Sequence, residues 1–108
     1  MPDNLGELEQ LVMLALLRLG EDAYGIPVQQ ELARVARRHA TFATVYSTLQ
    51  RLETKGFVKS RLGDPTPERG GRRKKFFAVT GAGSRALRRS MQATERMSRG
   101  IDPSWERR

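Results

Sequence analysis

Residues 5–19 carry apolar side chains at helical spacing on two sides, and no other feature limits the possible folds as strongly. One face consists of Leu5, Leu8, Val12, Ala15 and Leu19, and the second of Leu11, Leu14 and Leu17. A helix that is apolar on two sides needs two surfaces to bury it. A chain of 108 residues has one small core and no cysteine for a disulfide. The sequence therefore predicts that a second copy of the chain covers the other face; a fully central helix is the alternative.

Two further helices are predicted before Gly56. Gly20 ends the first helix, and the next runs over residues 24–38. Its inner face consists of Ile26, Val28, Leu32 and Val35. After a break at His39 and Ala40, Thr41 is a good N-cap for a third helix that ends near Lys55. The second and third helices together predict a helix-turn-helix.

After Gly56 the period of the pattern changes to two. Residues 57–62 and 73–79 are predicted strands around the turn-rich segment GDPTPERGG, and Thr80 caps a fourth helix that ends near residue 100. Residues 103–108 are predicted to fray. The fold class is therefore mainly α with a β-hairpin, a winged helix-turn-helix plus one C-terminal helix. We divide the chain into residues 1–79 (winged helix-turn-helix), 80–100 (dimerisation helix) and 101–108 (tail).

Positive charge is segregated along the chain. Residues 34–99 hold 17 basic and 4 acidic side chains, whereas the whole chain has a net charge of +8. A polyanion is the natural partner of such a region, although an acidic protein or an anionic membrane would also fit. The longest apolar run has 7 residues, well below the length of a membrane span, and no secretion signal is present, so we expect a cytoplasmic protein.

The third predicted helix has an exposed face suited to a DNA major groove. Phe42, Val45, Leu49 and Leu52 form its buried face, and the opposite side carries Ala43, Ser47, Gln50, Arg51 and Thr54, flanked by Thr44 and Lys55. Small residues allow close approach, Gln50 can bond base edges, and Arg51 and Lys55 can meet phosphates. Tyr46 lies at the seam, where its hydroxyl could reach a phosphate. An ordinary solvated face and a tyrosine that only packs are the alternatives.

The predicted hairpin is densely basic. Residues 59–75 hold seven basic and two acidic side chains. Gly70 and Gly71 allow the tip to approach a backbone closely, and Arg72 beside them could enter a minor groove or contact phosphates. Arg73 and Lys74 follow. A nucleic-acid wing is favoured over a wing that is only solubilising.

The residues needed for catalysis or for metal binding are missing. The chain has one histidine, His39, and no cysteine, and no glycine-rich loop follows a strand, so we predict neither an enzyme nor a cofactor or metal site. Met91 and Met97 are interpreted as interface side chains rather than ligands.

The segments LLRLGEDAYGIPVQQEL and TFATVYSTLQRLETKGFVKSRLGDPTPERGGRRKKFFAVTGAG closely resemble the PadR-type transcriptional regulators over about residues 5–90. The resemblance implies a dimeric winged-helix protein that binds palindromic DNA, usually as a repressor. Tyr46 matches the family's tyrosine in the recognition helix, and Gly70, Gly71 and Arg72 match its wing tip. The single last helix resembles the short subfamily, in which that helix pairs with the partner's first and last helices. Some short members bind flat aromatic drugs against tryptophans there, but Trp105, the only tryptophan here, lies beyond that helix.

The predicted partners are double-stranded DNA and a second copy of the chain. The predicted DNA-binding residues are Tyr24, Thr41, Ala43, Thr44, Tyr46, Ser47, Gln50, Arg51, Lys55, Gly70, Gly71, Arg72, Arg73 and Lys74. The predicted dimer interface consists of Leu5, Leu8, Val12, Leu87, Met91 and Thr94. Two alternatives remain: an interaction module for an acidic protein or RNA, and a ligand-gated sensor with a pocket between subunits.

Overall fold

The computed structural model describes residues 5–64 and 73–107 of the chain. Its helices are α1 (Glu7–Leu19), α2 (Gly25–Val35), α3 (Phe42–Thr54) and α4 (Gly81–Ser98), and its strands are β1 (Val58–Leu62) and β2 (Lys75–Val79). The predicted order of three helices, a hairpin and a fourth helix is confirmed. Two short 3-10 turns, η1 (Gly20–Asp22) and η2 (Pro103–Arg107), were not predicted, and η2 occupies the segment expected to fray.

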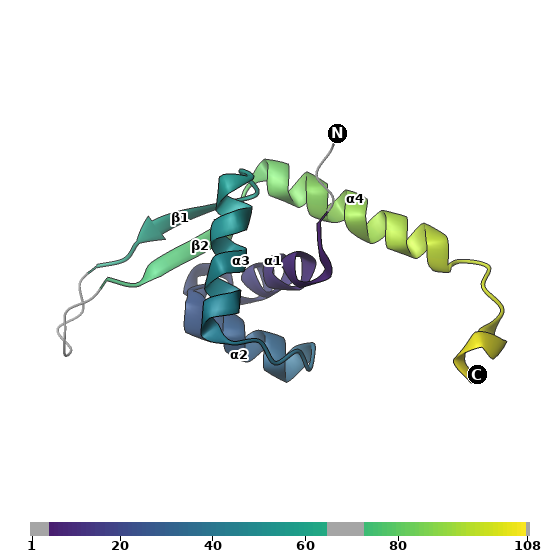
Figure 1. The fold of residues 1–108 in the computed structure, drawn as a ribbon. Helices are drawn as coiled ribbons and strands as arrows, with labels where there is room; N and C mark the ends of the chain where they lie inside the picture. The colour runs from purple at the N-terminus through teal and green to yellow at the C-terminus, as the bar shows by residue number, and fades with distance from the viewer. Residues whose placement is uncertain (1–4, 65–72, 108) are drawn as a thin grey trace.

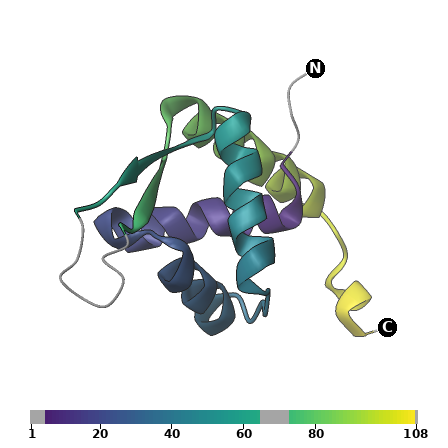
Figure 2. The same cartoon turned by 60° about the vertical axis from the view of Figure 1, so that its left-hand side comes forward.

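The helices α1, α2 and α3 form the body of the molecule, with α3 crossing in front of α1 (Figures 1 and 2). The side chains at their centre are completely or almost completely buried and include Val12, Met13, Leu16, Val28, Leu32, Val45, Leu49 and Leu52. The hairpin and α4 project from this body in opposite directions, so the longest dimension of the molecule is 57 Å (Figure 1).

The hairpin is part of a sheet with a third, very short member. β1 and β2 are antiparallel, with Val58 opposite Val79 and Leu62 opposite Lys75. On the other edge of β2, Tyr24 forms a bridge with Phe76, and the Phe77 amide donates a hydrogen bond of 2.8 Å to the carbonyl of Ala23. The segment before α2, of which we predicted Tyr24 as the start of the second helix, therefore anchors the wing to the body.

Several predicted boundaries and faces were wrong. α2 ends at Val35 rather than near residue 38, because Arg37 has a left-handed backbone (φ 55°) and the Arg38 amide turns back to the Leu32 carbonyl. Ile26 and Val35 are exposed and do not belong to the inner face. Phe42, assigned to the buried face of the third helix, is about half exposed. β2 begins at Lys75 instead of residue 73.

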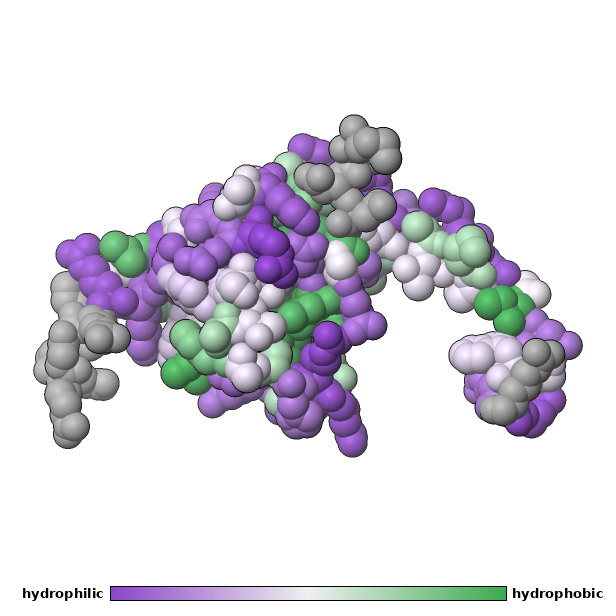
Figure 3. Space-filling model, viewed as in Figure 1, coloured by the Kyte–Doolittle hydropathy of each residue, from purple (hydrophilic) through white to green (hydrophobic). Residues whose placement is uncertain are grey.

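α4 joins the body only through its first turns. The Thr80 hydroxyl accepts a hydrogen bond from the Gly83 amide, as a cap should, and Gly83, Ala86 and Leu87 are buried. From residue 91 to residue 103 every residue is exposed, and Figure 3 shows hydrophobic patches among the polar surface of this arm. Within the described ranges, none of the helices is both long enough and apolar enough to cross a membrane.

Candidate nucleic-acid interface

The N-terminal part of α3 presents small polar side chains to solvent. Burial of Val45, Leu49 and Leu52 turns the opposite side of the helix outward. The predicted contact residues on this side are all exposed, namely Thr41, Ala43, Thr44, Ser47, Gln50 and Arg51. In Figure 3 this surface is pale at its lower, N-terminal end and more hydrophilic above.

Some of these side chains form hydrogen bonds at the start of the helix, whereas the side chain of Gln50 does not. Thr41 Oγ1 accepts the Thr44 amide at 3.1 Å, and Ser47 Oγ donates to the Thr44 carbonyl at 3.1 Å. Gln50 makes no side-chain hydrogen bond to any residue that the structure describes. Its amide, with both donor and acceptor atoms, is therefore available for an external partner.

The C-terminal cations of α3 face a buried carboxylate. Glu9 of α1 is only 6% exposed. Its Oε2 lies 2.9 Å from Lys55 Nζ and 3.7 Å from Arg51 Nε, and its Oε1 accepts the Gly6 amide at 2.8 Å. Burial raises the pKa of Glu9, but the Gly6 amide and the two cations outweigh it, so that the pKa lies below its ordinary value. Lys55 is thus held toward α1, and Arg51 remains the more exposed cation.

Glu9→Gln is expected to lower the free energy of unfolding at pH 7 by about 1 to 2 kcal/mol, because Lys55 and Arg51 lose their anionic partner. The carboxylate has a depressed pKa in the folded state, so its contribution is present above the ordinary pKa of 4.5 and is lost as the pH falls through the folded pKa. Urea unfolding of the wild type and of Glu9→Gln at pH 7 and pH 3 measures the difference in the free energy of unfolding. A difference that does not shrink at pH 3 would contradict the assignment.

Tyr46 is half-buried, as its predicted place at the seam between the buried and exposed faces of the helix implies, and it also contacts the wing. Its half-buried ring stacks on Phe42 at a centroid distance of 5.9 Å and meets Phe77 of β2 edge-on at 6.2 Å. Glu53 of α3 adds a polar link to the same strands, because it accepts the Ser60 hydroxyl and lies 3.6 Å from Lys75 Nζ. The base of the wing is therefore fixed to the recognition helix.

The exposed cations of the wing lie beside Tyr24. Lys74 Nζ donates to the Tyr24 hydroxyl at 3.3 Å and lies 4.6 Å from the centre of its ring. Arg73 is exposed next to it. Predicted contact residues Gly70, Gly71 and Arg72 lie outside the described residues. The structure thus brings Tyr24 and Lys74 together, a pairing that their separation of 50 residues in sequence did not reveal.

The residues predicted to form a dimer interface fall into two groups. Leu5, Val12 and Leu87 are buried within their own chain, and Leu8 is half-buried. Met91 and Thr94 are exposed. The second apolar face of α1 ends at Leu17, which is 56% exposed, and a groove of about 370 Å³ separates α1 from α4 there.

Sequence reasoning missed Glu9 and Glu53, which fix α3 to α1 and to the wing. For Glu9 a partial signal exists, since an acidic residue three positions after a helix N-cap can accept the N-cap amide, as Glu9 does from Gly6. No group of three or more potential metal ligands occurs in the parts of the chain that the structure covers.

Residues 13–89 match the family described as "Transcriptional regulator PadR-like family". The structure is similar to that of a PadR family transcriptional regulator from Eggerthella lenta, with a TM-score of 0.67, 30% identity, and coverage of 87% of this chain and 81% of that one. A PadR-like transcription factor from Bacteroides fragilis gives a TM-score of 0.69 at 26% identity, covering 83% and 82% of the two chains.

A transcriptional regulator from Clostridium thermocellum shares the fold, with a TM-score of 0.70 at 21% identity and coverage of 83% and 82%. Among curated proteins, no match was found. A match over most of the chain, on a winged helix-turn-helix with an exposed polar recognition face, decides the family. The chain belongs to the PadR-like family of transcriptional regulators, which are DNA-binding proteins rather than enzymes.

Proposed function

We propose that the protein is a repressor that binds an inverted-repeat operator as a homodimer. The observation that carries this proposal is the exposed face of α3, which combines the Gln50 amide, unpaired within the described residues, with the small residues Ala43 and Ser47. Such a face fits the major groove, because small residues admit the base edges and an amide can form two hydrogen bonds with adenine.

The dimer is supported by the unpartnered half of α4. Met91 and Met97 are exposed on a helix that leaves the body, and Leu14 and Leu17 of α1 line the groove beside its first turns. A twofold axis along this surface would present two copies of α3 to half-sites about one helical turn apart. A dimer bound to half-sites that overlap a promoter would block transcription by occupying it.

Selection of bound sequences from a random duplex pool tests the operator, and sedimentation at micromolar concentration tests the dimer. We expect a species of two chains in sedimentation. We also expect an enriched inverted repeat to which the protein stays bound in the presence of competitor DNA. Binding that competitor DNA removes completely would instead indicate a generic basic module for RNA or an acidic protein. A monomer, or enrichment of a single half-site, would overturn the homodimer. Transcription in vitro from a promoter that overlaps the selected site tests repression, which an increase in transcript would exclude.

Tyr46→Phe is expected to weaken DNA binding by about 0.5 to 1.5 kcal/mol on all sequences, because we infer that the hydroxyl at this seam bonds a phosphate oxygen. The ring contacts with Phe42 and Phe77 need no hydroxyl, so the thermal stability should stay unchanged. Fluorescence anisotropy on the selected operator and on a scrambled duplex measures both affinities. Unchanged affinity on both would leave Tyr46 with a packing role only.

A further inference from the structure

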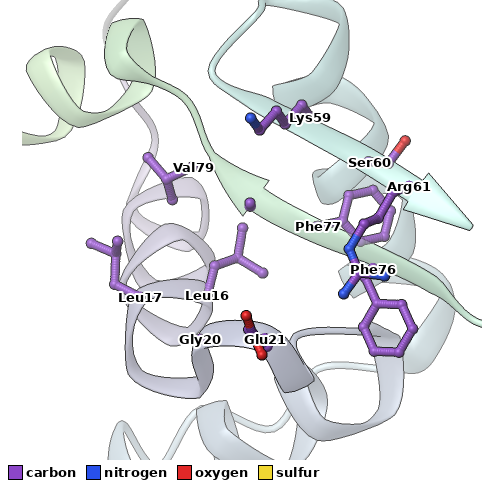
Figure 4. Close-up of a pocket in the computed structure, with 11 residues that line it drawn as sticks. Leu16, Leu17, Gly20, Glu21, Lys59, Ser60, Arg61, Phe76, Phe77 and Val79 are labelled. Carbon is purple, nitrogen blue, oxygen red and sulfur yellow. The ribbon is translucent and has the colours of Figure 1, made fainter. Parts of the chain in front are cut away.

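A groove of about 620 Å³ lies on the side of the wing sheet that faces away from α3 (Figure 4). Its walls are the C-terminal end of α1, the turn η1 and the outer face of β1 and β2. The groove is larger than the one between α1 and α4, which measures about 370 Å³. Its volume is within the range of small-molecule sites in proteins.

The strand register explains why this face is hollow. Lys59 pairs with Ala78 and Arg61 pairs with Phe76, so these four side chains share one face of the sheet. Ala78 contributes only a methyl group at the centre of that face. Gly20, with a φ of +62°, turns the chain away from the axis of α1 at the opposite wall. Together, a small residue and a turn leave space between α1 and the sheet.

The groove combines an apolar floor with charges on two edges. Leu16, Leu17 and Val79 supply aliphatic surface, and the exposed fraction of Leu17 is 56%. Lys59 and Arg61 stand on the sheet, and neither forms an ion pair with any residue in the described ranges. The guanidinium of Arg61 lies over the Phe76 ring, 4.6 Å from its centre. Glu21 stands on the opposite wall, below Leu16 in Figure 4.

We propose that this groove binds an amphiphilic organic anion, such as an aromatic or aliphatic carboxylate or sulfonate. The anionic group would lie against Lys59 and Arg61, where two cations lack a carboxylate partner within the described residues. The apolar body would cover Leu16, Leu17 and Ala78. Glu21 repels an anion from the other wall, so the three charges together fix the orientation of the ligand.

The site is separate from the recognition face. α3 packs on the opposite face of the sheet, through Tyr46 against Phe77 and through Glu53 against Ser60. A ligand in the groove therefore contacts the wing from behind, between the strands and α1, and leaves the exposed side of α3 uncovered. The inference does not depend on the operator or on the sign of regulation.

The test measures binding of 1-anilinonaphthalene-8-sulfonate to the full chain by fluorescence titration, with the uncharged N-phenyl-1-naphthylamine as the matched probe. We expect saturable binding of the sulfonate at one site per chain. Ala78→Leu fills the hollow and should weaken both probes about tenfold or more. Lys59→Gln should weaken the sulfonate about fivefold and leave the uncharged probe unchanged. Ile26→Gln, at an exposed apolar residue of α2 outside both grooves, is the control and should bind both probes as the wild type does.

Lys59 and Ala78 are exposed, so both variants should fold, which circular dichroism checks. If Ala78→Leu unfolds, the titration of Lys59→Gln with the two probes is sufficient to test whether the groove binds the anion. Sulfonate binding that Lys59→Gln leaves unchanged, or that only Ile26→Gln removes, would overturn the proposal. Absence of sulfonate binding to the wild type would overturn it as well.

Discussion

Gly83→Ala is expected to lower the free energy of unfolding by about 3 kcal/mol, the largest effect on stability that we predict. A Cβ at this position would lie 2.0 Å from the Phe57 carbonyl oxygen and 3.0 Å from Met13 Cε. The carbonyl cannot easily move, because it accepts the Thr80 amide at 3.0 Å in the turn that leads into α4. The substitution would therefore force the first turn of α4 away from the body.

Thermal unfolding at one fixed protein concentration measures this effect, and Gly81→Ala is the matched control. Gly81 lies in the same helical turn, but its added Cβ would meet only Arg85 Nη1, at 3.5 Å. The control should be neutral or up to about 1 kcal/mol more stable, since alanine restricts the unfolded chain. Gly83→Ala should lower Tm by about 10 °C or more. Equal Tm values for the two variants would show that α4 is docked differently.

Sequence periodicity predicted the elements well where one element alone sets the pattern. α3 keeps a capping threonine, three buried aliphatic residues at helical spacing and a terminal glycine, so its bounds differ from the prediction by only a residue. Periodicity predicted the wrong buried residues where burial depends on a segment distant in the sequence. Ile26 and Val35 have the spacing of an inner face, but both are exposed, and the buried residues of α2 are Gly25, Val28 and Leu32.

The bridge between Tyr24 and Phe76 shows the same limit, since two residues of extended backbone leave no periodicity to read. Of the candidate interface, the exposed side of α3 could be predicted because it is the complement of a buried stripe. The pairing of Glu9 with Lys55 could not be predicted from the sequence, because it joins residues 46 positions apart and depends on how α3 crosses α1. A cation at the end of a predicted recognition helix is therefore not necessarily directed at phosphate.

The last prediction separates base contacts from phosphate contacts within the interface. Gln50→Ala should cost about 1 to 3 kcal/mol on the selected operator and little on random duplex, because the amide of Gln50 has no partner in the described part of the chain and is expected to bond a base edge of the operator. This is the largest effect on DNA recognition that we predict. Anisotropy titrations on both duplexes measure it.

Arg73→Gln combined with Lys74→Gln should instead weaken both duplexes alike. Because both cations are exposed on the wing, their loss should flatten the dependence of log K on log salt by about 1.8, or 0.9 for each phosphate contact. Arg89→Gln with Arg96→Gln, on α4, changes the net charge equally and should change the slope less, because these arginines lie on the helix that points away from the wing (Figure 1). If the two double variants lose the same slope, the wing acts only through net charge. If Gln50→Ala weakens random DNA as much as the operator, α3 does not read bases through this residue.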